Sequence, residues 1–328
     1  MKRVLALAIT VCILGVLFWK ADQPRLFENL KHTNWLWFAA AIAAFIPQIG
    51  TIAWRWKRLV SVFAPIGLAE SVKLILASQT MNLVLPSKMG DLSKGYFLSR
   101  RGTLNLPRAM NVVIFEKLLD VATLAAFMLA GVAVLLLRGN ETSLQFRAAM
   151  LAGCAGGAAL AVVAVLYFVP PAYVPGLGQL LAFLEAKPRL RKVHALFSTS
   201  HDVITLLQSR GGRRGEILLL SVTIWVMHLG QIYCFFRCLD AQPSLGQFCT
   251  LVPLAIFIGL LPISIAGFGT RDAALIVLFP QYPREVMLGV ALYVNLRYLL
   301  PAAAGASFLH KYLQLSKPTA TETSPAGS

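Results

Sequence analysis

The hydrophobic residues of this chain gather into long runs that are separated by short polar segments. A run of about 20 apolar residues crosses the hydrocarbon core of a bilayer as an α-helix. Six runs approach or exceed that length, and we interpret each as a spanning helix: residues 4–19, 35–54, 121–137, 148–169, 217–236 and 286–309. The pattern predicts an all-α integral membrane protein with about six spanning helices.

Two further segments, residues 66–100 and 246–280, are apolar but interrupted. Each has two halves that are too short to span the bilayer, joined by a turn that contains Pro and Gly. The halves are residues 68–81 and 92–98 in the first segment, and 248–261 and 273–279 in the second. Irregular backbone at membrane depth is tolerated only where protein or water satisfies its polar groups. We therefore expect two re-entrant helical hairpins, with an amphipathic hairpin on the inner leaflet as the alternative for the first.

The two interrupted segments carry the same order of residues around their turns. A Leu-Pro pair is followed by a hydroxyl residue, a glycine, and a cation with an acid. The motif comprises Leu85, Pro86, Ser87, Gly90, Asp91 and Lys94 in the first segment, and Leu261, Pro262, Ser264, Gly267, Gly269, Arg271 and Asp272 in the second. Broken helices of opposed orientation are typical of inverted-repeat transporters with a site near the bilayer midplane. The sequence thus predicts an inverted-repeat-like arrangement.

The charged residues indicate the orientation of these segments. The chain is 57% hydrophobic and 13% charged, and its formal net charge is +16. With the N-terminus in the cytoplasm, 20 of the 30 Lys and Arg residues fall on the cytoplasmic side and 8 on the outer side. This asymmetry follows the positive-inside rule, so we place both termini in the cytoplasm and expect anionic headgroups as partners. Nucleic acid is not an expected partner.

The domain organisation follows from the same pattern. Residues 1–312 form one polytopic membrane domain, in which residues 170–215 make a cytoplasmic connector. The connector is Pro-rich at first and is expected to be helical from 187 to 209. Residues 313–328 are interpreted as a disordered cytoplasmic tail, because Pro, Thr, Ser and Ala dominate there.

Charged residues inside spanning helices cost about 2.5–3.5 kcal/mol each on insertion scales, so they are candidates for function. Glu116 and Asp120 lie four residues apart on one helix face, and Arg297 lies in the last helix. The two acids either neutralise Arg297 or Lys94 and fix helix packing, or they form a proton-coupled or headgroup-amine site. Both alternatives predict buried ion pairs.

The hairpin turns are the expected place for an anionic ligand. Half-helix N-termini carry partial positive charge and attract anions such as phosphate. Lys88, Lys94 and Arg271 add full charges there. The expected substrate-binding residues are those of the two turns together with the intramembrane charges: Asn82, Pro86, Ser87, Lys88, Gly90, Asp91, Lys94, Glu116, Asp120, Pro262, Ser264, Gly267, Gly269, Arg271, Asp272 and Arg297.

Other polar residues are expected to have structural roles. His228 and Gln231 are positioned to hydrogen-bond between helices, and packing explains the five cysteines, which lie in or beside apolar runs. The sequence has no metal-ligand spacing, nucleotide-binding glycine loop, or nucleophile paired with a base. We expect no metal, no cofactor and no catalytic residue.

Three ordered motifs resemble the lysylphosphatidylglycerol synthase transmembrane-region family, which is also called flippase-like. The resemblance covers about residues 3–312, and Asp91 and Asp272 stand where Glu is common in the family. It implies a membrane domain that translocates or presents lipid, without the soluble aminoacyl-transferring domain of the multiple-peptide-resistance factor in the same family. The motifs are Asn82-x-x-Leu85-Pro86-Ser87-Lys88-Met89-Gly90-Asp91-x-x-Lys94-Gly95-Tyr96, then Glu116-Lys117-x-x-Asp120, then Pro262-x-Ser264-x-Ala266-Gly267-x-Gly269-x-Arg271-Asp272.

We therefore expect a flippase-like transporter or presenter of anionic lipid in the bacterial inner membrane, and not an enzyme. The lipids that fit are a phospholipid, an aminoacyl-phospholipid, or a polyprenyl-phosphate- or hopanoid-linked lipid. One alternative is an accessory protein without transport, partnered by a lipid-biosynthesis enzyme of a lipid or hopanoid pathway. The other is an integral-membrane lipid transferase that uses Glu116 and Asp120. The sequence leaves the oligomeric state open.

Overall fold

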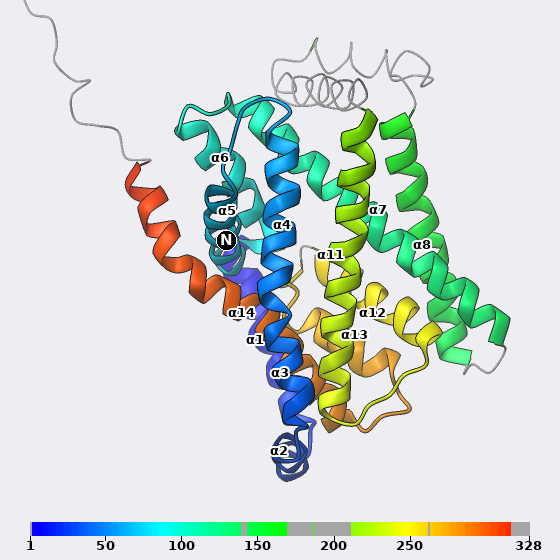
Figure 1. Ribbon diagram of the computed structural model, residues 1–328. Helices are drawn as coiled ribbons and strands as arrows, with labels where there is room; N and C mark the ends of the chain where they lie inside the picture. The colour runs from blue at the N-terminus through cyan, green and yellow to red at the C-terminus, as the bar shows by residue number, and fades with distance from the viewer. Residues whose placement is uncertain (1, 139–142, 169–185, 187–210, 262, 316–328) are drawn as a thin grey trace, which may run out of the picture.

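The computed structural model describes residues 2–138, 143–168, 186, 211–261 and 263–315 (Figure 1). All regular structure in these ranges is helical. Most of the predicted connector, including the expected helix at 187–209, and the tail beyond Leu315 lie outside them. The elements are α1 (Lys2–Trp19), α2 (Gln23–Lys31), α3 (Trp35–Ala43), α4 (Phe45–Val60), α5 (Leu68–Val84), η1 (Pro86–Asp91), α6 (Leu92–Arg100), α7 (Leu106–Arg138), α8 (Ser143–Phe168), α11 (Gly211–Cys238), α12 (Leu245–Leu260), α13 (Thr270–Leu278) and α14 (Arg284–Leu315).

The described residues contain four to five candidate membrane spans, and the count of about six stays a prediction. The expected span at 148–169 falls on α8, which is helical over the 26 residues Ser143–Phe168 and contains the apolar stretch Phe146–Ala161. A fifth span results if α1 and α2, which meet at 88°, count as one bent helix pair. The described part of the chain thus supports a multi-pass membrane protein with four to five spans. Four segments are long and apolar enough to cross: Trp35–Val60, Leu106–Leu137, Gly215–Cys238 and Arg284–Gln314.

The second apolar run is divided at Ala44 into α3 and α4. Pro47 lies in the first turn of α4, and proline has no N–H to donate to the carbonyl of Ala43. The N-terminus of α3 is capped by Asn34, whose side chain accepts hydrogen bonds from the N–H groups of Leu36 and Trp37. The missing donor of Pro47 accounts for the division of one predicted helix into two.

Two helix-turn-helix units occupy the interrupted segments of the sequence. The first hairpin consists of α5, η1 and α6, and the second hairpin consists of α12, the turn at 261–269 and α13. Their helix bounds lie within three residues of the predicted halves. α13 begins at Thr270 rather than at residue 273, because the Asp272 carboxylate accepts a hydrogen bond from the N–H of Gly269 and caps the helix.

The turn of the second hairpin depends on glycine. Gly267 and Gly269 have φ angles of +80° and +81°, in the left-handed region that glycine adopts most readily. A Cβ at Gly267 would also lie 2.8 Å from the carbonyl oxygen of Gly259, near the end of α12. Backbone conformation and close contact therefore both require glycine here, and α13 returns directly against the end of α12.

Each hairpin packs against the long helix that follows the other hairpin. α7 follows the first hairpin and packs on α12, whereas α14 follows the second hairpin and packs on α5. A Cβ at Gly131 of α7 would lie 2.5 Å from Thr250 of α12, and a Cβ at Gly305 of α14 would overlap the carbonyl of Leu76 of α5. In Figure 1 the first hairpin lies above the second. The two halves of the chain therefore interlock around the centre of the molecule.

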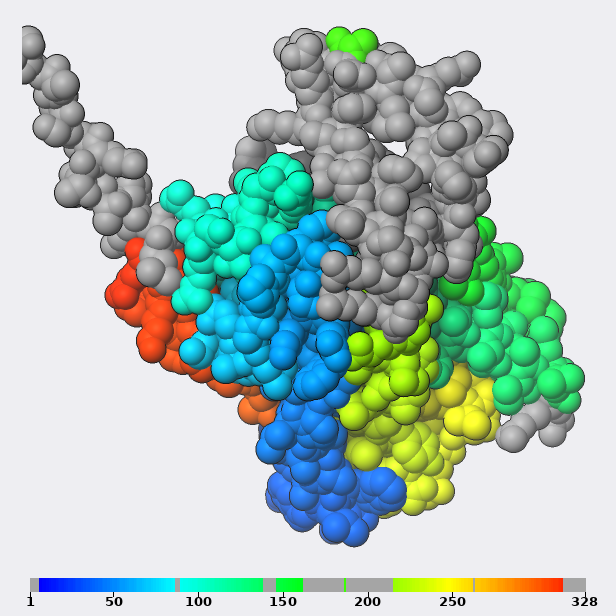
Figure 2. All heavy atoms as spheres, turned by 45° about the horizontal axis from the view of Figure 1, so that its top comes forward, coloured from blue at the N-terminus to red at the C-terminus, as the bar shows by residue number. Residues whose placement is uncertain are grey.

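The remaining contacts complete this interlocked arrangement. α3 and α4 pack against α11, and in the space-filling view of Figure 2 the blue surface of α4 adjoins the yellow-green surface of α11. One apolar core lies among α11, α12 and α14 and contains Phe235 and Leu251. A second core lies among α4, α5, α6 and α7 and contains Trp56 and Leu74. The polar residues described next lie where these two cores meet.

Candidate functional site

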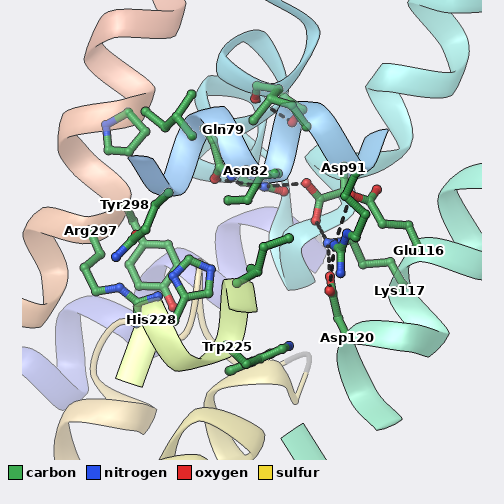
Figure 3. Close-up of a pocket in the computed structure, with 18 of the residues that line it drawn as sticks. Gln79, Asn82, Asp91, Glu116, Lys117, Asp120, Trp225, His228, Arg297 and Tyr298 are labelled. Carbon is green, nitrogen blue, oxygen red and sulfur yellow. Dashed lines mark hydrogen bonds and ion pairs between the residues drawn. The ribbon is translucent and has the colours of Figure 1, made fainter. Parts of the chain in front are cut away.

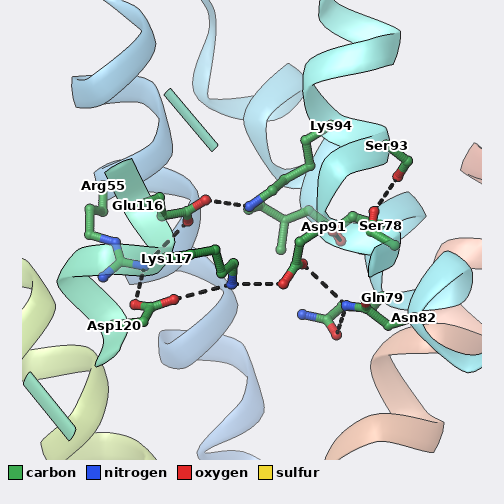
Figure 4. A network of polar contacts seen from close by, with 12 residues as sticks. Arg55, Ser78, Gln79, Asn82, Asp91, Ser93, Lys94, Glu116, Lys117 and Asp120 are labelled. Carbon is green, nitrogen blue, oxygen red and sulfur yellow. Dashed lines mark hydrogen bonds and ion pairs between the residues drawn. The ribbon is translucent and has the colours of Figure 1, made fainter. Parts of the chain in front are cut away.

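A buried network of ion pairs joins α4, α6 and α7 (Figure 4). Arg55 of α4 places its Nη2 atom 3.3 Å from Oε1 of Glu116 and 2.7 Å from Oδ1 of Asp120. The other Glu116 oxygen, Oε2, lies 2.5 Å from Nζ of Lys94 in α6. The side chains of Arg55, Lys94 and Glu116 are at most 2% exposed. One carboxylate therefore serves two buried cations.

The network continues through Lys117 to the tip of the first hairpin. Its Nζ lies 2.7 Å from Oδ2 of Asp91 and 3.1 Å from Oδ2 of Asp120. The other oxygen of Asp91 accepts a hydrogen bond of 3.1 Å from Nδ2 of Asn82. We call the six charged residues, three cations and three carboxylates, the ion-pair network: Arg55, Asp91, Lys94, Glu116, Lys117 and Asp120.

Local structure explains how these side chains meet. Residues three and four apart are neighbours on a helix, so Glu116, Lys117 and Asp120 project from one or two turns of α7 toward the first hairpin. A Cβ at Gly90 would overlap the backbone of Asn82, so glycine is needed where η1 folds back on the last turn of α5. This close approach brings Asp91 within reach of Lys117.

The second hairpin holds a smaller cluster of its own. Nη2 of Arg271 lies 3.0 Å from Oδ1 of Asp272 and also donates a hydrogen bond to Oδ1 of Asn295 in α14. Oδ2 of Asp272 accepts hydrogen bonds of 3.0 Å from the N–H of Gly269 and 3.1 Å from Nδ2 of Asn295. The N-terminus of α13 is thus capped by a carboxylate of the same hairpin. Ser264 lies in the same turn, where its Oγ is 2.8 Å from Oγ1 of Thr270.

A cavity of about 140 Å³ lies between the ion-pair network and α14 (Figure 3). Compared with the volume that one water molecule needs, this cavity has room for several waters or for a lipid headgroup. Figure 3 shows Arg297 and Tyr298 of α14 and His228 of α11 on one side, with Asp91, Lys117 and Asp120 on the other. Polar side chains of α5 and an indole of α11 complete the lining used below: Gln79, Asn82 and Trp225.

The charges around this cavity do not cancel. Seven charged side chains line it: the six of the ion-pair network, which balance, and Arg297. No carboxylate in the described part of the chain forms an ion pair with Arg297, and its buried Nε has no hydrogen-bond partner there. Its guanidinium carbon lies 5.8 Å from the ring centroid of Tyr298. The cavity wall therefore carries one uncompensated positive charge.

The structure decides several expectations about individual residues. Glu116 is paired and buried as expected, whereas Asp120 is paired but 19% exposed. Of the two expected partners Lys94 is the one found, and Arg297 lies across the cavity. Lys94 and Arg271, expected to hold an anion, are already paired with Glu116 and Asp272. The side chains of Pro86, Ser87 and Lys88, and all of Pro262, lie outside the described part of the chain.

The sequence-based expectations missed Arg55 and Lys117 as members of the network. Arg55 stands beside the basic residues Lys57 and Arg58 near a helix end, yet helical spacing places it on the same face of α4 as Gln48 and Leu59, and all three are buried. That spacing is the signal that distinguishes Arg55 from Lys57 and Arg58.

The other polar expectations concern α11. Nε2 of Gln231 donates a hydrogen bond of 2.8 Å to the carbonyl of Ala41, which confirms the predicted contact between helices. His228 lines the cavity, and its ring meets that of Trp225 edge to face. Among the described residues, no group of three or more His, Cys, Asp or Glu side chains is arranged to hold a metal ion.

Fold and site together define a multi-pass helical membrane protein with a charged cavity enclosed between two interlocked halves. The chain matches the family described as "Lysylphosphatidylglycerol synthase TM region" over residues 3–305, and it therefore belongs to that family. A comparison with curated proteins gave no match.

Proposed function

We propose that this protein moves an anionic lipid headgroup through the bacterial inner membrane, or presents it there, as a flippase-like member of its family. The observation that carries the proposal is the uncompensated charge of Arg297 on the wall of the central cavity. A cation held in a membrane protein away from any carboxylate is costly, so a ligand that supplies the negative charge recovers free energy. A lipid phosphate is the most abundant such anion in a bilayer.

The cavity suits the polar end of a lipid rather than its acyl chains. Beside apolar residues such as Ile49 and Ile75, its lining has seven charged side chains and neutral hydrogen-bonding groups such as Gln79 and Asn82. The acyl chains do not have to enter the cavity, because they can remain in the hydrocarbon of the surrounding bilayer. In this proposal the headgroup crosses through the polar interior while the chains remain in lipid, which avoids the cost of exposing phosphate to hydrocarbon.

The two hairpins would supply the path on either side of the cavity. We propose that both are re-entrant and oppositely oriented, as in inverted-repeat transporters. The reciprocal packing of α7 on α12 and of α14 on α5 supports this arrangement, because a two-fold relation between the halves exchanges these two contacts. Access from each side would then alternate through small movements of one half against the other.

In this proposal the ion-pair network is a structural frame rather than a proton pathway. Glu116 and Asp120 each contact two cations, so both carboxylates are already engaged in ion pairs. The network connects α4, α6 and α7, which form one side of the cavity. It would keep that side rigid while Arg297, on the opposite side, meets the ligand.

Reconstituted liposomes test this function. Purified protein is incorporated into vesicles that contain a fluorescent phosphatidylglycerol, and dithionite is added to bleach the label in the outer leaflet. We expect the protein to expose the inner-leaflet label to bleaching, and the Arg297→Gln variant to do so at least tenfold more slowly, because it lacks a charge-assisted contact to phosphate.

The control is the Arg237→Gln variant. Arg237 is a second arginine of a spanning helix with a buried, unpartnered Nε, but it lies against Trp37 and does not line the cavity. If wild-type protein exposes no more label than protein-free vesicles, for anionic and zwitterionic lipids and with or without a pH gradient, transport is excluded. An accessory role beside a lipid-biosynthesis enzyme would then be the better account.

A further inference from the structure

We infer that the headgroup taken by the central cavity is a phosphate ester that bears free hydroxyl groups and no amine, such as a phosphoglycerol. This inference rests on the proposed function and narrows the substrate class. Two observations support it. The carboxylates around the cavity are already paired with cations, and some buried polar atoms there lack a hydrogen-bond partner among the described residues. The relevant residues come from three helices: Asn82 of α5, Trp225 of α11 and Arg297 of α14.

The cavity has no carboxylate to offer an ammonium group. Each of its three carboxylates lies within 3.3 Å of a Lys or Arg nitrogen of the ion-pair network. An amine-bearing headgroup would have to displace Lys117 from Asp91 or Asp120, and would leave that lysine without a partner. The remaining charge, Arg297, repels an ammonium group. Electrostatics thus disfavours aminoacylated and ethanolamine headgroups here.

The buried polar atoms around the cavity that lack a hydrogen-bond partner among the described residues include two on uncharged side chains. One is the indole Nε1 of Trp225, which only donates, and the other is Oδ1 of Asn82, which only accepts. Leaving such atoms unsatisfied is unfavourable, so a ligand that satisfies both gains affinity. A hydroxyl group both donates and accepts, whereas an ammonium group cannot accept and an ionised phosphate diester cannot donate.

The positions of these groups allow one ligand to use all of them. Figure 3 shows Asn82, Trp225 and Arg297 around the same cavity, on three different sides. A phosphate beside Arg297 would leave the rest of the headgroup directed toward Asn82 and Trp225. A polyol chain has several hydroxyl groups and can hydrogen-bond to both atoms. A short apolar ester group can form a hydrogen bond with neither of them.

Short-chain lipids that differ only in the headgroup test this inference. Native mass spectrometry of the purified full-length protein measures binding of dihexanoyl phosphatidylglycerol, phosphatidylmethanol and phosphatidylethanolamine. The first two carry one negative charge each and differ by the hydroxyls. We expect phosphatidylglycerol to bind about fivefold more tightly than phosphatidylmethanol, as one or two added hydrogen bonds predict, and phosphatidylethanolamine to bind most weakly.

A pair of tryptophan variants assigns the preference to the cavity. Trp225→Phe removes the donor and should reduce the preference for phosphatidylglycerol over phosphatidylmethanol to about twofold. Trp56→Phe is the matched control, because its Nε1 is also buried and unpartnered in the described part of the chain but does not line the cavity. This control should keep the fivefold preference.

The possible failures separate this inference from the proposed function. Equal binding of phosphatidylglycerol and phosphatidylmethanol, or tighter binding of phosphatidylethanolamine than of phosphatidylglycerol, overturns the inference and leaves anionic lipid binding or transport standing. An unchanged preference in Trp225→Phe overturns the role of the indole donor and with it the argued binding mode. Absence of binding by all three lipids counts against the proposed function itself.

Discussion

The two hairpins bury similar residues at their tips but compensate them in different ways. In the first hairpin, Lys94 and Asp91 find partners outside the hairpin, in Glu116 and Lys117 of α7. In the second, Arg271 and Asp272 pair with each other, and the neutral residues Asn295 and Tyr298 of α14 contact them. A similar sequence motif therefore gives one hairpin that is tied to its surroundings by ion pairs and one that is nearly self-contained.

In the proposed function, this difference separates the residues that hold the structure from the one that binds the ligand. Asp91 and Lys94 of the first hairpin are paired within the ion-pair network, and Arg271 and Asp272 of the second pair with each other. The positive charge that remains belongs to Arg297, which lies in neither hairpin. In the proposed function, the motif residues thus shape and support the cavity, while the following helix, α14, would supply the charge for recognition.

Removal of Glu116 should have the largest effect on stability. Glu116→Gln leaves Lys94 without a carboxylate and weakens the contact of Arg55, and breaking a buried pair costs about 3–5 kcal/mol. We expect a loss near the upper end of that range, measured as the free energy of unfolding in detergent. Adding Lys94→Met should recover part of it, because the buried charge is then absent.

The control for Glu116 is Glu216→Gln. Glu216 pairs with Arg58, and both side chains are about one third exposed, so its loss should cost less than about 1 kcal/mol. If the two variants lose equal stability, the ion-pair network is not the frame of the first hairpin.

Removal of Asp272 should have a smaller effect. Asp272→Asn leaves one buried cation, Arg271, which keeps its hydrogen bond to Asn295, and the new amide oxygen can still accept from the N–H of Gly269. We expect a loss of about 3 kcal/mol in the free energy of unfolding, below that of Glu116→Gln. A loss equal to or larger than that of Glu116→Gln would remove the energetic distinction between the two hairpins.

The turn of the second hairpin should be the next most sensitive feature. Gly267→Ala combines a left-handed backbone with the contact to Gly259, and we expect it to cost about 2 kcal/mol. Gly102→Ala is the control, since Gly102 has a φ of +71° but open space around its Cβ position, and it should cost about 1 kcal/mol. Equal losses would show that the close contact contributes nothing.

Much of the fold could be predicted from the sequence because local features determine it. Short apolar halves separated by Pro and Gly placed both hairpins within three residues of their observed helices. The way in which the first apolar run combines with the helix after it could not be predicted. α1 and α2 meet at 88°, and the length of an apolar run does not reveal such an angle, whereas the second run remains one candidate span, Trp35–Val60, despite its division into α3 and α4.

The candidate site was harder to predict because ion pairing depends on which helices meet. Glu116 and Asp120 were identified from their positions in an apolar helix, but that reasoning did not select Lys94 over Arg297 as the partner. Arg55 was missed since it precedes Lys57 and Arg58, and a basic cluster at a helix end is usually solvated. Only tertiary contact shows that it points inward.

The most direct test of the central claim is the lipid that the protein retains on purification. Wild-type protein, Arg297→Gln and the Arg237→Gln control are extracted in mild detergent, and bound phospholipid is quantified by mass spectrometry. We predict that anionic lipid is enriched over the membrane composition in the wild type and in Arg237→Gln, and that Arg297→Gln loses this enrichment while remaining folded. Equal enrichment in all three proteins would contradict the assignment of Arg297 as the cation that binds the headgroup.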